Sequence, residues 1–225
     1  MFKTILFDLD ETIFDFKKSE AAAVANALKQ IGVKPNEKIV KRYSEINESL
    51  WKKLEKGEIS RQEVLTKRFE ILFDELSVDF DSSEMKKIYE KNLSQTGHLI
   101  DGAVELLEKI YQKYNLYIVS NGTLSVQLGR IKCSEIGKYF KELFISEVIG
   151  SVKPQKQFFD YCFERIPDIN LEETLIVGDS LSSDILGGNN AGIKTCWFNP
   201  NHQINTLGVK VDYEISKLDE LLKII

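Results

Sequence analysis

From residue 99 onward, short apolar runs alternate with helical patterns, and this alternation constrains the fold more than any other feature. The runs are rich in β-branched and aromatic side chains, as buried strands are. Apolar residues at helical spacing separate most of them, as over Ala103–Ile110 and Phe158–Cys162. Strands alternating with helices predict βαβ units and therefore an α/β fold with a parallel sheet. The expected strands are Thr4–Phe7, Leu116–Val119, Leu143–Ile145, Thr174–Val177, Lys194–Phe198 and Val211–Ile215.

Residues 16–98 contain no convincing strand. Apolar stripes at helical spacing fill this block instead, and they run through Ala21–Ile31, Ile39–Leu54, Val64–Leu76 and, more briefly, Met85–Tyr89. The block interrupts the α/β pattern between the first strand and the rest. We therefore expect two domains, a core of residues 1–15 and 99–225 and an inserted helical subdomain of residues 16–98.

The composition narrows the possible functions. The net charge of −5 argues against a nucleic-acid-binding surface, which needs clustered Lys and Arg. No apolar run approaches the roughly 20 residues of a membrane span, and the N-terminus lacks a signal-peptide pattern. The three cysteines are far apart and odd in number, which is typical of reduced thiols in a cytoplasmic protein. With only two histidines, a zinc site is disfavoured, and a hard metal held by carboxylates is the remaining metal option.

Polar residues follow four of the expected strands. They are Asp8, Asp10 and Thr12 after the first strand, Ser120 and Asn121 after the second, Lys153 shortly after the third, and Asp179 and Asp184 after the fourth. Ligands of open parallel sheets bind beyond the carboxyl ends of the strands. We therefore expect these side chains to share one site.

This set of groups suits phosphoryl transfer. Asp8 can attack phosphorus as a nucleophile, and Asp10 can act as the acid and then the base. Mg²⁺ held by Asp8, Asp179 and the Asp10 backbone carbonyl would offset the repulsion between carboxylates and phosphate. Lys153 would hold both the nucleophile and the phosphate.

The remaining candidates support that machinery. Ser120, Asn121 and nearby backbone N–H groups are expected to bind the phosphate oxygens. Asp184 would orient Lys153 and metal-bound water, and Thr12 is a further supporting position. Each short motif alone also suits an ordinary turn or helix cap. Their occurrence together, each beside an expected strand end, favours a catalytic site.

At this point the sequence resembles the haloacid dehalogenase superfamily over essentially its whole length. The motif DxDx[TV] is Asp8-Leu9-Asp10-Glu11-Thr12, the Ser or Thr motif is Ser120, the lysine motif is Val152-Lys153-Pro154, and GDxxxxD runs from Gly178 to Asp184. The resemblance implies a Rossmann-like core, Mg²⁺ dependence and a small helical cap inserted after the first motif. Dehalogenase members lack the second aspartate of the first motif, so Asp10 favours a phosphatase or a phosphotransferase.

A narrower resemblance is to the bacterial pyrimidine 5′-nucleotidase branch of the superfamily. It is carried by Phe144–Gly150, Gly178–Leu181, Asn190–Gly192, Thr195–Pro200 and, in the helical block, Ile46–Trp51. It implies removal of phosphate from pyrimidine nucleoside monophosphates. In the cap, a nucleobase needs an aromatic wall with a few polar groups. Asn47, Trp51, Arg68 and Phe69 are the candidates, although helix packing also explains the aromatic ones.

The first hypothesis is therefore a Mg²⁺-dependent phosphomonoesterase acting on a small phosphorylated metabolite, most specifically a 5′-nucleotidase with pyrimidine preference. A sugar-phosphate phosphatase and a phosphoglucomutase-like transferase are the alternative enzymes. A non-catalytic binding protein on the same fold is a third possibility, but it should have lost a nucleophile or metal ligand. The sequence leaves the preferred base, the sugar and the oligomeric state open.

Overall fold

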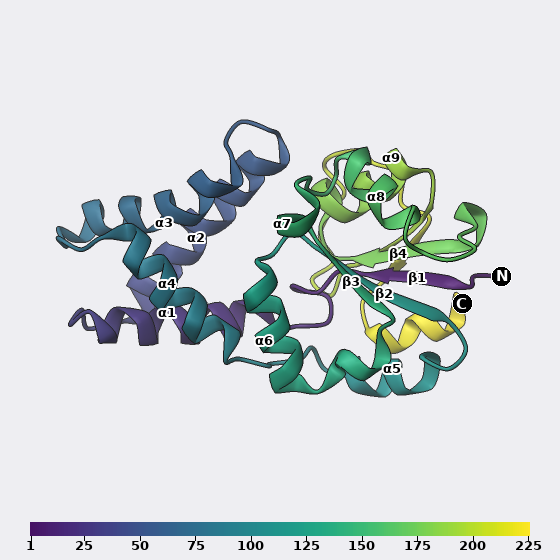
Figure 1. Ribbon diagram of the computed structural model, residues 1–225, viewed down its shortest axis with the longest axis horizontal. Coiled ribbons are helices and arrows are strands. Elements are labelled where there is room, and N and C mark those ends of the chain that lie inside the picture. Colours follow the sequence, from purple (N-terminus) through teal and green to yellow (C-terminus); the bar gives the residue numbers. More distant parts are fainter. The chain divides into compact units, whose positions relative to one another are not determined.

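The computed structural model describes residues 1–225 and contains one six-stranded sheet (Figure 1). All neighbouring strands are parallel, and their order is β3-β2-β1-β4-β5-β6. The predicted α/β fold with a Rossmann-like parallel sheet is thereby confirmed. The strands are β1 (Thr4–Phe7), β2 (Asn115–Ser120), β3 (Glu142–Ile145), β4 (Thr174–Gly178), β5 (Lys194–Phe198) and β6 (Tyr213–Ile215).

Helices make up most of the remaining chain, and none of them has both the length and the apolar character needed to span a bilayer. The last helical segment, Leu218–Lys223, is a 3₁₀-helix. A π-helical turn, Leu181–Ile185, follows β4. The α-helices are α1 (Phe16–Gln30), α2 (Glu37–Glu55), α3 (Arg61–Leu76), α4 (Ser82–Ser94), α5 (Ala103–Ile110), α6 (Leu124–Ser134), α7 (Ser146–Ile149), α8 (Lys156–Phe163) and α9 (Leu186–Ala191).

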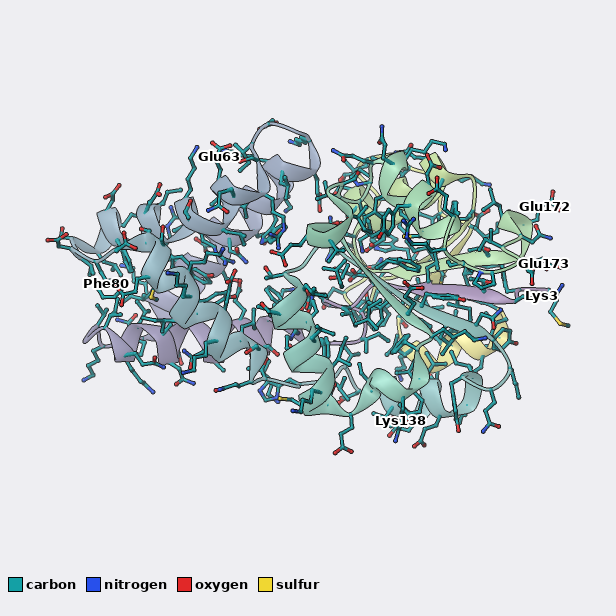
Figure 2. All side chains as sticks on the ribbon, in the orientation of Figure 1. Lys3, Glu63, Phe80, Lys138, Glu172 and Glu173 are labelled. Carbon is teal, nitrogen blue, oxygen red and sulfur yellow. The ribbon has the colours of Figure 1, made fainter.

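The central strands are covered on both faces, which explains their continuous apolar runs. Leu6, Val119 and Ile176 share a buried cluster with Phe158 and Phe159 of α8. Figure 1 shows α8 and α9 on one side of the sheet and α5 on the other. At the amino end of β1, Lys3 forms an ion pair with Glu173 at 2.8 Å (Figure 2). The polar residues that follow the strands therefore lie at the opposite edge.

The chain divides into two compact units. The sheet unit comprises Met1–Asp15, Leu99–Leu124 and Ser134–Ile225, and the helical unit comprises Phe16–His98 and Ser125–Cys133. This division differs from the expected one in that most of α6 groups with the inserted helices. The reason is close packing within the helical unit, where a Cβ on Gly129 of α6 would lie 2.5 Å from the carbonyl oxygen of Ser94.

Helix caps and stacked aromatic rings organise the helical unit. Ser60 and Glu63 form a reciprocal capping box at the start of α3, where Figure 2 labels Glu63. In the core, the Tyr43 and Phe69 rings are stacked with centroids 5.3 Å apart, and Tyr89 packs against both. Such aromatic contacts add to the stabilisation from apolar burial.

Candidate active site

Asp8 and Asp179 follow the two central strands, β1 and β4. The connections from β1 lead toward β2 on one side and those from β4 lead toward β5 on the other, so the strand order reverses between them. Ligands of open α/β sheets bind at such a switch point. The backbone N–H of Asp8 continues the ladder by donating to the carbonyl oxygen of Val177 at 2.9 Å. Both residues thus lie at the place where the fold favours a ligand.

Lys153 connects Asp8 to Asp184 from within the site. Its Nζ atom donates to Oδ1 of Asp8 at 2.6 Å, to Oδ1 of Asp184 at 2.7 Å and to the carbonyl oxygen of Val119 at 2.8 Å. The residue is only 1% exposed. An ammonium group has three donors, and all three are used here. Lys153 is therefore a fixed positive charge beside the Asp8 carboxylate.

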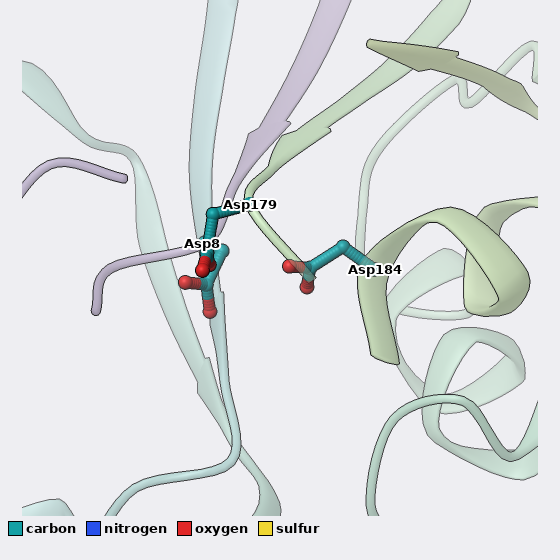
Figure 3. Close-up of side chains that lie close together, drawn as sticks. All are labelled: Asp8, Asp179 and Asp184. Carbon is teal, nitrogen blue, oxygen red and sulfur yellow. The ribbon is translucent and has the colours of Figure 1, made fainter. Parts of the chain in front are cut away.

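Asp184 approaches the end of β4 so closely that only glycine fits there. A Cβ on Gly178 would lie 2.3 Å from both Cγ and Oδ2 of Asp184. The Oδ2 atom also accepts a hydrogen bond from the backbone N–H of Ser180 at 3.1 Å. Carboxylate oxygens of Asp8, Asp179 and Asp184 all lie within 4.8 Å of one another (Figure 3).

Burial and the repulsion of neighbouring acids disfavour the charged forms of Asp8 and Asp179. Burial, together with the charges of Asp184 and Asp10, raises the pKa of Asp8 to about 8 despite the opposing effect of Lys153. Burial and the charges of Asp184 and Asp8 raise the pKa of Asp179 well above its usual value. Burial alone would lower the pKa of Lys153, but Asp184 and Asp8 outweigh it and raise that pKa. The ammonium therefore stays charged, while the carboxylates lack sufficient positive charge around them.

The donor set fits a divalent cation. Both oxygens of Asp184 are engaged by Lys153 and Ser180, whereas the Asp179 carboxylate makes no hydrogen bond within the protein. Asp8 and Asp179 are therefore the carboxylates best placed to bind a cation. Hard oxygen ligands with room for water suit Mg²⁺.

The loop after β1 places Asp10 and Thr12 of the first motif. Phe14 and Ile13 donate backbone N–H bonds to the carbonyl oxygen of Leu9, which folds the loop tightly. Asp10 is half-buried there and contributes to the raised pKa of Asp8. Thr12 is fully buried, and its hydroxyl makes no hydrogen bond.

Ser120 ends β2 and Asn121 follows it, but their side chains have local partners. The Ser120 hydroxyl accepts the backbone N–H of Gly122 at 3.1 Å. The Asn121 amide accepts the Lys153 backbone N–H at 2.9 Å and donates to the Lys153 carbonyl oxygen at 3.0 Å. This double hydrogen bond fixes the lysine loop to β2, which is a positioning role that sequence reasoning missed.

A second missed contact comes from β5. The Trp197 indole N–H donates to the carbonyl oxygen of Asp179 at 2.8 Å, and the side chain is 3% exposed. Register places Trp197 beside Gly178 of β4, which brings the ring to the start of the Asp179 loop. The sequence shows Trp197 only as an apolar strand residue, so nothing in it signalled this role.

The four candidates in the helical block also lie together. Arg68 and Trp51 both donate to the side-chain oxygen of Asn47, and the Arg68 guanidinium lies 5.1 Å from the centroid of the Phe69 ring. Glu20, which sequence reasoning missed, accepts a hydrogen bond from the Asn47 amide at 2.7 Å. The sequence signal that could have identified Glu20 is a charged residue within the apolar stripe of α1.

A Rossmann-like parallel sheet with an acid cluster and a buried lysine at its switch point is the class of fold and site that the sequence motifs predicted. The sequence pattern of the haloacid dehalogenase-like hydrolase family matches residues 5–198. The chain belongs to this family, which confirms the resemblance drawn from its motifs.

Individual relatives align over nearly the whole chain. The HAD-hydrolase YfnB of Bacillus subtilis is 40% identical over 100% of this chain and 95% of its own length. A crystal structure of YfnB with bound magnesium superimposes with a TM-score of 0.95, covering 99% of this chain and 98% of that one. The pyrimidine 5′-nucleotidase PynA of Streptococcus pneumoniae is 38% identical over 98% of this chain and 94% of its own length. The pyrimidine 5′-nucleotidase YjjG of Escherichia coli is 31% identical over 96% of this chain and 95% of its own length.

Proposed function

We propose that the protein is a Mg²⁺-dependent phosphoric monoester hydrolase that acts through an aspartyl-phosphate, and that its substrates are pyrimidine nucleoside 5′-monophosphates. The observation that carries this proposal is the 2.6 Å contact between Lys153 Nζ and Asp8 Oδ1 beside Asp179. The contact places the candidate nucleophile, Asp8, and the fixed positive charge of Lys153 beside the candidate metal ligand Asp179, at the carboxyl ends of the strands. Membership of the hydrolase family and the nucleotidase activity of PynA and YjjG support it.

In this mechanism each residue has a separate task. A carboxylate oxygen of Asp8 attacks phosphorus and forms the aspartyl-phosphate, while Asp10 gives a proton to the departing ester oxygen. Asp10 then accepts a proton from the water that hydrolyses the intermediate. Lys153 keeps Asp8 in place and stabilises negative charge on the phosphoryl oxygens. Mg²⁺, held by Asp8 and Asp179, would neutralise the repulsion between the acids and the phosphate.

We assign the helical unit the role of a cap that recognises the leaving group. Residues 16–98 contain the buried polar group around Asn47, which the phosphate chemistry does not require. We further propose a cytoplasmic location, in keeping with three free cysteines.

A substrate screen with and without metal tests the proposal. Phosphate release is measured from uridine, cytidine and adenosine 5′-monophosphates and from ribose 5-phosphate, in Mg²⁺ and in EDTA. We expect Mg²⁺-dependent release that is fastest with the pyrimidine nucleotides. Faster release from ribose 5-phosphate would favour a sugar-phosphate phosphatase, and isomerisation of a sugar phosphate without release would favour a mutase. No turnover across a panel of divalent metals would favour a binding protein.

The Asp10→Asn variant tests the acid role separately. Loss of the acid should slow hydrolysis of a nucleotide more than hydrolysis of p-nitrophenyl phosphate, whose leaving group needs little protonation. An equal loss with both substrates would count against this role.

A further inference from the structure

Arg68 is buried in the helical unit and forms no direct ion pair; the buried carboxylate of Glu20 is linked to it only through the shared side chain of Asn47. The residue is 3% exposed. Its guanidinium donates from Nε to the carbonyl oxygen of Leu65 at 3.3 Å and from Nη1 to Oδ1 of Asn47 at 3.1 Å, and it forms no ion pair with an acid. Burying a charge is costly unless a partner compensates it, so buried arginines are normally paired. Arg68 therefore departs from what packing alone would favour.

Much of the hydrogen-bonding capacity of Arg68 is unused. A guanidinium carries five N–H donors, and the two hydrogen bonds engage only two of them. The Nη2 atom makes no hydrogen bond, and it is not completely shielded from solvent. The guanidinium lies 4.7 Å from the centroid of the Tyr89 ring and 5.1 Å from that of Phe69. These contacts hold the planar group while leaving donors available at its edge.

Asn47 fixes Arg68 and Trp51 together. Its Oδ1 atom also accepts the Trp51 indole N–H at 3.1 Å, so the same oxygen anchors both side chains. Its Nδ2 atom donates to Oε1 of Glu20 at 2.7 Å, and Oε2 of Glu20 accepts from the Ser44 hydroxyl at 2.5 Å. Glu20 thereby sets the orientation of the Asn47 amide, with its oxygen toward Arg68 and Trp51.

Trp51 differs from the other aromatic residues of this group in being only half-buried. Tyr43, Phe69 and Tyr89 are 0%, 0% and 1% exposed. The indole of Trp51 is held through its N–H group, so an accessible part of the ring is kept in a fixed orientation. Asn47 thus holds an aromatic surface and a guanidinium with free donors side by side. A flat heteroaromatic ring with a carbonyl group requires both kinds of contact.

We propose that Arg68 and Trp51 recognise the base of the substrate, with the guanidinium donating to a ring carbonyl oxygen and the indole packing against the ring. This inference rests on the proposed nucleotidase function. Every pyrimidine base of nucleic acids carries a carbonyl group at C2, whereas adenine carries none. With adenine the buried donors remain unpaired, and such a site rejects the analogue that lacks the acceptor. Glu20 and Asn47 are positioning residues that act through this pair.

The test compares Arg68→Gln and Arg68→Lys with the wild-type enzyme. The measured quantity is the kcat/KM for uridine 5′-monophosphate divided by that for ribose 5-phosphate. Arg68→Gln should lower this ratio about tenfold or more, because it removes charged donors to the base. Arg68→Lys should lower it as well, because a single ammonium lacks the planar fork. Arg42→Gln is the matched control, since Arg42 of α2 is exposed and pairs with Glu75, and its ratio should match the wild type.

The outcomes separate the two proposals. If wild-type enzyme prefers ribose 5-phosphate to every nucleotide, the proposed function fails and this inference fails with it. If wild type prefers uridine 5′-monophosphate and Arg68→Gln keeps the ratio within about twofold, only the inference is overturned. If Arg68 had only a structural role, Arg68→Gln would lower kcat/KM by the same factor for both substrates and leave their ratio unchanged. Adenosine 5′-monophosphate provides a further check, since Arg68→Gln should affect it less than the uridine nucleotide.

A binding measurement covers the case in which variants fold poorly. Uridine 5′-monophosphate is titrated into Asp8→Asn protein, and tryptophan fluorescence is recorded. We expect a saturable change that is lost in Asp8→Asn/Trp51→Phe, a variant that keeps an aromatic ring in place. An unchanged signal in the double variant would overturn the role of Trp51.

Discussion

Lys153 Nζ lies 2.6 Å from Oδ1 of Asp8, and the same nitrogen lies 2.7 Å from Oδ1 of Asp184. One ammonium group thus serves two carboxylates that are far apart in the sequence. Because breaking such a buried arrangement leaves uncompensated charge, Lys153 should matter for stability as well as for chemistry.

Replacing Lys153 with Met tests that dual role. We expect the free energy of unfolding to fall by about 3–5 kcal/mol, together with loss of phosphatase activity. Urea denaturation followed by circular dichroism measures the change. Lys156→Met is the control, because Lys156 forms an exposed pair with Asp160 one turn away on α8, and such pairs contribute less than about 1 kcal/mol. Similar losses in the two variants would contradict the assignment.

The Asp8→Asn variant tests the covalent route. An amide cannot serve as the nucleophile, so turnover should fall to background while the thermal midpoint stays near that of the wild type. Phosphate release and a thermal melt are the measurements. Normal turnover in this variant would end the aspartyl-phosphate mechanism.

Gly178→Ala tests the close approach between β4 and Asp184. The added Cβ would lie 2.3 Å from the Asp184 carboxylate, so either the carboxylate or the strand must move. We expect a loss of roughly 1–3 kcal/mol in unfolding free energy and a marked loss of activity. Gly57→Ala is a useful comparison, because Gly57 has a positive φ but nothing within 4 Å of the added atom. Gly57→Ala should keep its activity, and full activity in Gly178→Ala would refute the steric argument.

The cysteines should differ sharply in reactivity. Burial raises the pKa of Cys196 to about 12 and raises the pKa of Cys162 still further, whereas Cys133 is exposed. Since the thiolate is the reactive form, a thiol reagent near pH 8 should label one cysteine in the native protein and all three after unfolding. The Cys133→Ser variant should abolish the native reaction, and rapid labelling that persists in it would contradict the buried positions.

The sequence predicted the sheet and most of the strand-end residues because a parallel sheet brings the carboxyl ends of its strands to one edge. Asp8, Lys153 and Asp179 could be expected to meet for that reason alone. The individual partners could not be predicted. The Asn121 amide holds the backbone of Lys153, and the Trp197 indole holds that of Asp179, because three-dimensional register decides which groups come within hydrogen-bonding distance.

Helical periodicity likewise identified the inserted block but not its polar interior. Glu20 falls on the stripe of α1 that packs inward, where spacing alone gives no reason to expect a carboxylate. The placement of α6 with the inserted helices depends on contact between Gly129 and Ser94, which no local pattern contains.

The position of β1 in the sheet has a consequence for the order of events during translation. β1 emerges from the ribosome first, yet its neighbours β2 and β4 begin only at Asn115 and Thr174. A nascent chain therefore carries Asp8 without both of its flanking strands until β4 has been made. Catalytic competence arrives only once Lys153 and Asp179 have been made, so nonsense products that stop before Asp179 would lack the centre however well their helices form.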